Sequence, residues 1–90
     1  RAAVCGGSGG SLIQTAAAKG AEVLITGDVK YHEAQAAVDL GLTVIDAGHA
    51  GTERVVVPAL VNYLKAQPAV VEAGVEIWPS AVRENIWHVV

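Results

Sequence analysis

The sequence predicts an α/β fold: a three-layer sandwich with a mostly parallel sheet of four or five strands and alternating helices. Two observations predict it. Short runs rich in apolar and β-branched residues indicate strands, and segments with helical spacing of apolar residues separate the first four of them. The connecting segments are long enough for parallel pairing through right-handed crossovers. The five expected strands are residues 2–5, 22–26, 42–45, 75–78 and 86–90.

Three helices are expected between these strands. The first carries apolar residues at helical spacing from Leu12 and ends at Gly20, a residue typical of helix C-termini. The second spans about 31–40 and is closed by another glycine, Gly41. The third spans about 52–67, and its first turn should be either separate or bent at Pro58, because an interior proline removes a backbone donor.

Length and composition indicate one small α/β domain over residues 1–90. Hydrophobic residues make up 52% and charged residues 17%, a balance that excludes a disordered chain. The sequence contains no methionine and begins at Arg1, directly in an apolar run. We therefore expect this domain to be an internal or C-terminal piece of a longer protein.

The charges and the short apolar runs argue against nucleic acid and membranes as partners. Six basic residues stand against nine acidic ones with no basic cluster, so we expect no direct binding of nucleic acid. No apolar run approaches the roughly 20 residues that cross a bilayer, and no signal peptide is visible. The single cysteine, Cys5, fits a reducing, cytoplasmic setting.

Three unusual loops each follow a predicted strand directly: GGSGGS (residues 6–11), TGDVKYH (26–32) and DAGHAGTE (46–53). The carboxyl ends of parallel strands share one edge of a sheet, and ligands bind there in open α/β folds. The loops should therefore lie together, although they are far apart in the sequence.

The third loop predicts a pair of metal ligands. His49 and Glu53 are four residues apart, so on a helical turn they face the same way. Imidazole and carboxylate suit Zn, Fe, Mn and similar ions. The alternative is that Glu53 lies in the first turn of a helix, where its negative charge interacts favourably with the helix dipole, and that His49 is a polar loop residue. Two ligands do not complete a metal centre.

The second loop predicts groups that handle protons and anions. His32 can transfer a proton near neutral pH, Asp28 can orient an imidazole, and Lys30 is a cation. Equally, Asp28 could cap the next helix, with Lys30 and His32 merely exposed to solvent.

The first loop has backbone amides that could hold a phosphate at a helix start. It lacks the spacing of a dinucleotide-binding fingerprint and the Gly-Lys-Ser/Thr of a P-loop. The alternative is a tight strand-to-helix turn that needs glycine.

Together, VCGGSGGSLI (residues 4–13), ITGDVKYHEA (25–34) and VIDAGHAGTE (44–53) resemble the Nif-three-like dinuclear metal centre family, also called type-2 GTP cyclohydrolase I. The resemblance implies two α/β lobes with two metal ions in the cleft between them, and residues 1–90 resemble the C-terminal lobe alone. It makes His49 and Glu53 metal ligands, with the remaining ligands supplied by an N-terminal lobe. It places the GDVKYH segment in the same cavity and implies a hexamer. Ala50 departs from the family, which often carries an aromatic residue there.

The expected function is therefore half of a dinuclear metal-dependent, hydrolase-like protein, a GTP cyclohydrolase or a related enzyme. Its substrate would be a nucleotide or another small phosphorylated molecule, attacked by water that the metal ions activate. In that function His32 and Asp28 would handle protons or orient ligands, and Lys30 would anchor the substrate. Two alternatives stay open: a metal-binding interaction or regulatory module without turnover, and a phosphate-binding α/β module.

Overall fold

The computed structural model describes residues 1–82. The chain divides into two compact units, Arg1–Val55 and Val56–Val90, which are described separately. The strand expected at residues 86–90 lies outside the described residues.

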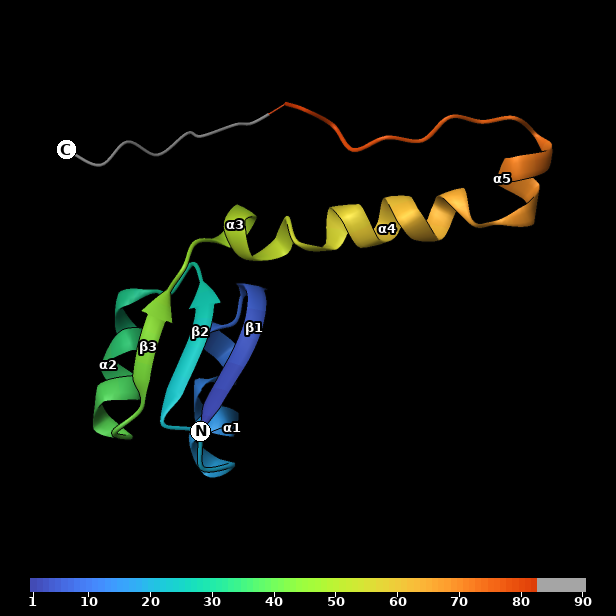
Figure 1. Ribbon diagram of the computed structural model, residues 1–90. Coiled ribbons are helices and arrows are strands. Elements are labelled where there is room, and N and C mark those ends of the chain that lie inside the picture. The colour runs from blue at the N-terminus through green and yellow to red at the C-terminus, as the bar shows by residue number, and fades with distance from the viewer. Residues whose placement is uncertain (83–90) are drawn as a thin grey trace. The chain divides into compact units, whose positions relative to one another are not determined.

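The first unit contains a parallel sheet of three strands, in the order β1-β2-β3 (Figure 1). They are β1 (Ala2–Ser8), β2 (Val23–Gly27) and β3 (Thr43–Asp46). Ile25 of β2 lies opposite Val4 on one side and Ile45 on the other. A register shift interrupts the pairing of β1 with β2 between Val4 and Ser8, where the glycines begin. The α/β class and the three N-terminal strands are thus confirmed.

Two helices cover one face of this sheet. A 3₁₀ turn, η1 (Gly10–Leu12), leads into α1 (Ile13–Ala18), and α2 (Tyr31–Asp39) connects β2 to β3. Both helices end at a glycine with positive φ, 75° at Gly20 and 68° at Gly41, as their positions in the sequence predict. The helices enclose a small core with the inward side chains of the sheet. Its buried apolar residues are Ile13, Ala16, Leu24, Ala37 and Leu42.

The opposite face of the sheet is open within this unit. Val4 is 73% exposed and Ile45 is 48% exposed, although both carry apolar side chains. The unit Arg1–Val55 therefore has two layers, with the parallel sheet as one of them. An apolar run such as residues 22–26 is typical of a strand covered on both faces, but neither α1 nor α2 lies on the second face.

A short helix, α3 (His49–Glu53), follows β3 and completes the first unit. It is separate from α4 (Val56–Lys65), so the helix expected over residues 52–67 is divided, and its first turn is separate, which is one of the two alternatives expected from Pro58. Pro58 lies in the first turn of α4, where the missing backbone N–H would have no helical partner in any case, and no kink results.

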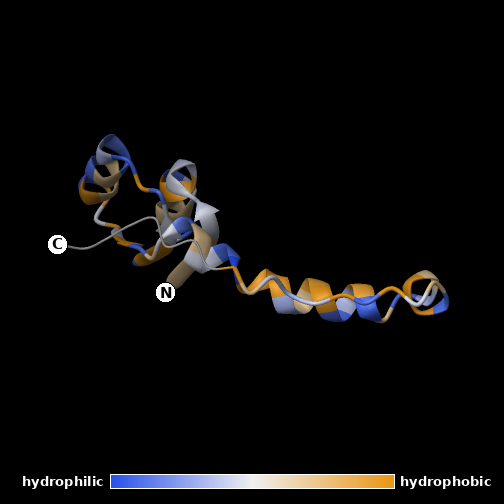
Figure 2. Cartoon of the chain, turned by 90° about the horizontal axis from the view of Figure 1, so that it is seen from above, coloured by the Kyte–Doolittle hydropathy of each residue, from blue (hydrophilic) through white to orange (hydrophobic). Residues whose placement is uncertain are grey.

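The second unit consists of α4 and α5 (Pro68–Glu72) in its described part, followed by residues without regular structure up to 82. Pro68 is the first residue of α5, a favourable helix position for proline. Apolar and polar residues share the surface of α4 (Figure 2).

The strand expected at residues 75–78 is wrong, and with it the count of four or five strands for the described residues. A strand exists only where a neighbouring strand takes up its backbone hydrogen bonds. None of the three described strands pairs with this segment. No helix within residues 1–82 has the length and apolar character needed to cross a membrane.

Candidate functional site

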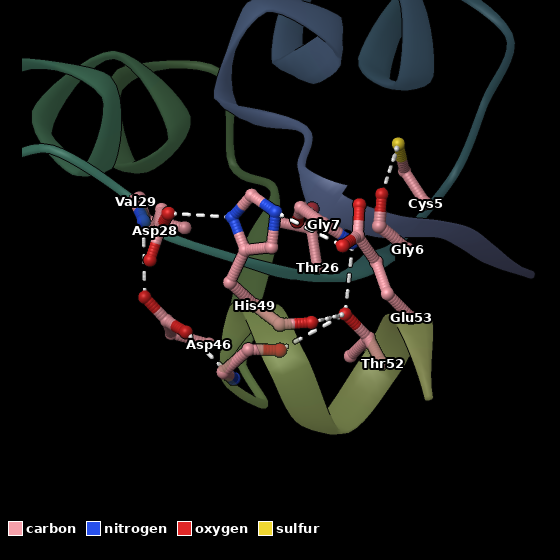
Figure 3. A network of polar contacts seen from close by, with 11 residues as sticks. Cys5, Gly6, Gly7, Thr26, Asp28, Val29, Asp46, His49, Thr52 and Glu53 are labelled. Carbon is pink, nitrogen blue, oxygen red and sulfur yellow. Dashed lines mark hydrogen bonds and ion pairs between the residues drawn. The ribbon is translucent and has the colours of Figure 1, made fainter. Parts of the chain in front are cut away.

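The three loops meet at the carboxyl edge of the sheet (Figure 3). Gly7 lies at the irregular end of β1, Asp28 follows β2 directly, and Asp46 ends β3 just before α3. This is the clustering that the order of strands and loops predicts. All of these residues belong to the unit Arg1–Val55.

His49 and Glu53 form a close pair on one face of α3. The Nε2 atom of His49 is 3.2 Å from the Oε2 atom of Glu53, and the two side chains are 44% and 56% exposed. The pair is close because residues four apart on a helix lie one turn above the other. Gly48, with a φ of 82°, turns the chain sharply from β3 into α3 and so brings His49 over the sheet edge.

Asp28 holds the other nitrogen of the His49 ring. Its Oδ2 atom lies 2.6 Å from Nδ1, so the imidazole stands between two carboxylates (Figure 3). Asp28 has a positive φ of 53°, which is uncommon outside glycine but is tolerated by Asp and Asn in turns.

The surroundings of His49 favour its protonated form. The hydrogen bond to Asp28 and then the negative charge of Glu53 raise the pKa of His49 above its ordinary value. Both neighbours are hydrogen-bond acceptors, so the ring satisfies them together only as an imidazolium. A cation that replaced the Nε2 proton could use the same nitrogen while Nδ1 still donates to Asp28.

Asp46 joins two of the loops, a role that the sequence reasoning missed. Its carboxylate accepts hydrogen bonds from the backbone N–H groups of Val29 and Gly48, both at 3.0 Å. These two bonds lower the pKa of Asp46 below its ordinary value. The available signal was Asp-Ala-Gly after a strand, since an aspartate commonly bonds the backbone N–H two residues ahead.

Backbone meets backbone where the second and third loops touch. A Cβ placed on Gly27 would lie 2.6 Å from the carbonyl carbon of Gly48 and 2.7 Å from the nitrogen of His49. Such distances leave no room for any side chain at Gly27. Because Gly27 has no side chain, the start of α3 can lie this close to the end of β2.

Lys30 and His32 lie on the same edge, at the start of α2, but apart from the His49 cluster. The backbone N–H of Lys30 donates to the Glu33 carboxylate at 2.8 Å, and Lys30 precedes the first residue of α2. Both side chains are exposed, and within residues 1–82 neither makes a hydrogen bond or ion pair. Asp28 does not cap the helix; it contacts His49 instead.

The chemistry of the His49–Glu53 pair fits part of a metal site. An imidazole nitrogen and a carboxylate oxygen already converge on one another, and both are common ligands of divalent metals. Within residues 1–82, no group of three or more His, Cys, Asp or Glu side chains is arranged to hold a metal ion. A complete centre at this pair would need donors from outside the described residues.

The fold and this edge define a class: a parallel α/β unit with an imidazole–carboxylate pair on a short helix at the carboxyl ends of its strands. The chain belongs to the Duf34/NIF3 (NGG1p interacting factor 3) family, whose model matches residues 1–86. This confirms the resemblance that the three loops indicate.

Curated relatives carry the name GTP cyclohydrolase 1 type 2 homolog. One from Nostoc sp. is 47% identical over 66 residues, which are 73% of this chain and 25% of the relative. One from Streptococcus pneumoniae is 40% identical over 88 residues, or 98% of this chain and 33% of the relative. The chain thus spans about a quarter to a third of these relatives.

Solved structures show the same fold. A Bacillus cereus protein related to NIF3 superposes with a TM-score of 0.89 at 35% identity, over 99% of this chain and 24% of its own. Reduced HcgD from Methanocaldococcus jannaschii superposes with a TM-score of 0.63 at 32% identity, over 73% of this chain and 27% of its own.

Proposed function

We propose that this chain is the C-terminal lobe of a two-lobed, dinuclear metal-binding protein with hydrolase-like activity. The observation that carries the proposal is the 3.2 Å approach of His49 Nε2 to Glu53 Oε2, with Asp28 bonded to the opposite ring nitrogen. A ligating histidine commonly has a carboxylate on its second nitrogen, which fixes its orientation. This arrangement gives each of the three side chains a separate task.

In this function His49 and Glu53 are metal ligands, and Asp28 orients His49 and keeps its Nδ1 proton in place. A bound divalent metal would supply Lewis acidity for hydrolysis. Lys30, exposed at the start of α2 on the same edge, would bind an anionic group of the substrate. His32, the second residue of that helix and exposed, would accept or donate a proton at the substrate.

The proposed substrate is a nucleotide or another small phosphorylated molecule. Support comes from the name GTP cyclohydrolase 1 type 2 homolog, which the relatives carry, and from the exposed cation at Lys30 on the same edge of the sheet. A cytoplasmic protein would fit such a substrate and the single cysteine.

The missing partner in this proposal is an N-terminal lobe that supplies the other metal ligands. The described residues place only two candidate ligands on α3, whereas metal sites need further donors. The relatives are three to four times as long as the stretch that this chain matches, which leaves room for a second lobe. We also propose that the assembled protein is a homo-oligomer, a hexamer by resemblance.

A second candidate function is a metal-binding interaction or regulatory module without turnover. The family name, NGG1p interacting factor 3, describes an interaction and favours this alternative. A phosphate-binding module based on the glycine loop alone has less support, because the Gly7 N–H group of that loop already donates to Thr52.

The test is the metal content of the full two-lobed protein, purified without chelator and measured by mass spectrometry. We expect about two divalent metals per chain, lost in His49→Ala and reduced in Glu53→Gln. His32→Ala is the matched control, since it removes another exposed imidazole outside the pair and should keep the metals. Unchanged metal content in His49→Ala would overturn the proposal. Hydrolysis of GTP or a phosphoester that disappears in His49→Ala separates the enzyme from the interaction module.

A further inference from the structure

Gly7 is held in place through both of its backbone groups. Its N–H donates to Thr52 Oγ1 at 2.9 Å, and its carbonyl accepts from Thr26 Oγ1 at 3.1 Å. Thr26 is fully buried in β2, and Gly7 itself is buried. Three elements, the end of β1, β2 and α3, therefore converge on one glycine.

The His49–Glu53 pair lies directly over this glycine. A Cβ placed on Gly7 would be 2.5 Å from Glu53 Oε1 and 3.3 Å from His49 Nε2. The first distance is shorter than any real Cβ contact, so a side chain at Gly7 would displace the Glu53 carboxylate. The φ of Gly7 is +68°, a conformation that residues with a side chain rarely adopt.

Thr52 ties α3 to Gly7 from between the two candidate ligands. Its hydroxyl accepts from the Gly7 N–H and lies 2.9 Å from the carbonyl oxygens of both Gly48 and His49. A hydroxyl has one proton to donate, so it serves one of these carbonyls at a time. The same side chain thus fixes the first turn of α3 and fastens that turn to the end of β1.

We propose that Gly7 and Thr52 are positioning residues for the metal-ligand pair: Gly7 is the surface on which both side chains rest, and the Thr52 hydroxyl holds α3 against it. This inference rests on the proposed function and deepens it. It assigns the first glycine loop to the geometry of the metal pair, in place of the phosphate binding that its composition suggests.

The main test compares two glycine substitutions in the full two-lobed protein. Gly7→Ala introduces a methyl group against Glu53, whereas Gly41→Ala introduces the same group at the same φ of +68° with nothing within 4 Å. Both should lose similar stability from backbone strain. Only Gly7→Ala should weaken Zn²⁺ binding, by about 10- to 100-fold in a chelator competition, as loss of a supporting contact does at other metal sites.

A second pair of variants tests the hydroxyl. Thr52→Val keeps the shape but removes the acceptor for the Gly7 N–H, and Thr52→Ser keeps it. We expect weaker Zn²⁺ binding and an altered visible d–d spectrum of the Co²⁺-substituted protein in Thr52→Val, with both restored in Thr52→Ser. A role in folding alone would change the unfolding midpoint and leave the spectrum of the bound Co²⁺ unaltered.

The outcomes separate the two proposals. If His49→Ala leaves metal binding unchanged, the proposed function fails and the inference fails with it. If His49→Ala abolishes binding while Gly7→Ala and Thr52→Val match Gly41→Ala and Thr52→Ser, the metal site stands and the positioning role is refuted. Should Gly7→Ala not fold, the Thr52 pair decides alone.

Discussion

The Nδ1 atom of His49 lies 2.6 Å from the Oδ2 atom of Asp28. This contact joins the loop after β2 to the first residue of α3, although 21 positions separate the two residues in the sequence. It also leaves Nε2 as the ring nitrogen that faces Glu53. The hydrogen-bonding direction of the imidazole is thus set by a residue on another strand end.

Asp28→Asn should lower the pKa of His49 toward its ordinary value of about 6.5. The hydrogen bond to Asp28 is the largest cause of the raised pKa, and an amide does not stabilise the imidazolium by charge. The shift can be followed from the His49 ring proton by NMR in metal-free protein. Asp39→Asn, at the far end of α2, is the control that should leave this titration alone.

The same pKa gives the sign of the pH dependence of stability. Because folding raises the pKa of His49, its contribution is fully present below the unfolded pKa, near 6.5, and is lost as the pH rises through the higher folded value. Urea unfolding across this range should show that loss in the metal-free protein. In Asp28→Asn the loss should be smaller and should end at a lower pH. An equal dependence of the unfolding free energy on pH in the unaltered protein and in Asp28→Asn would contradict this prediction.

Metal binding at His49 should compete with its proton. A metal at Nε2 requires the neutral ring, so binding releases a proton when the pH is below the raised pKa of His49. The apparent affinity for Zn²⁺ should then fall roughly tenfold for each pH unit below that pKa. Calorimetry in buffers of different ionisation enthalpy measures the released proton. An affinity that is flat across this range would exclude His49 as a ligand.

Asp46→Ala should cost about 1–3 kcal/mol of stability, because it removes two hydrogen bonds that typically contribute about 0.5–1.5 kcal/mol each. The substitution leaves the N–H groups of Val29 and Gly48 without their partner. Since folding lowers the pKa of Asp46, its contribution is present above the unfolded pKa, about 3.9, and is lost as the pH falls through the lower folded value. The difference in the free energy of unfolding between neutral and acidic pH should therefore be smaller in Asp46→Ala than in the unaltered protein.

Leu24→Ala should destabilise the first unit by about 2–5 kcal/mol, because it opens a cavity in the core. Leu24 is 1% exposed and is among the largest fully buried side chains of the described residues. Val4→Ala is the control on the same sheet: Val4 is 73% exposed, and its truncation should change the unfolding midpoint little. Equal losses in the two variants would show that the second face of the sheet is also covered.

The sequence correctly predicts the elements and the placement of the loop residues where a local signal and the tertiary contacts agree. Apolar runs located β1, β2 and β3, and the glycines at 20 and 41 marked the ends of α1 and α2. The i,i+4 spacing of His49 and Glu53 placed both on one helical face, and the strand order brought Asp28 to them. These features depend on periodicity and connectivity, which a sequence displays directly.

The remaining features depend on contacts that spacing does not encode. Residues 75–78 have the composition of a strand but no described neighbour to pair with, and composition cannot supply one. Pro58 indicates a separate or bent first turn, but the place of the break, before Val56, is hidden because apolar spacing runs on to 67. Gly7 has the sequence context of a phosphate-loop glycine, because the sequence does not show that Glu53 lies across it in the folded chain.

The approach of Gly27 to Gly48 has a consequence for engineering this lobe. Main chain packed on main chain has no rotamers to exchange, so the spacing between the two loops does not depend on how neighbouring side chains settle. Substitutions at core positions such as Ile13 or Ala37 that raise thermal stability should therefore leave the position of the His49 imidazole unchanged. A search for thermostable variants should accordingly begin with residues of α1 and α2 and leave Gly27 and Gly48 unchanged.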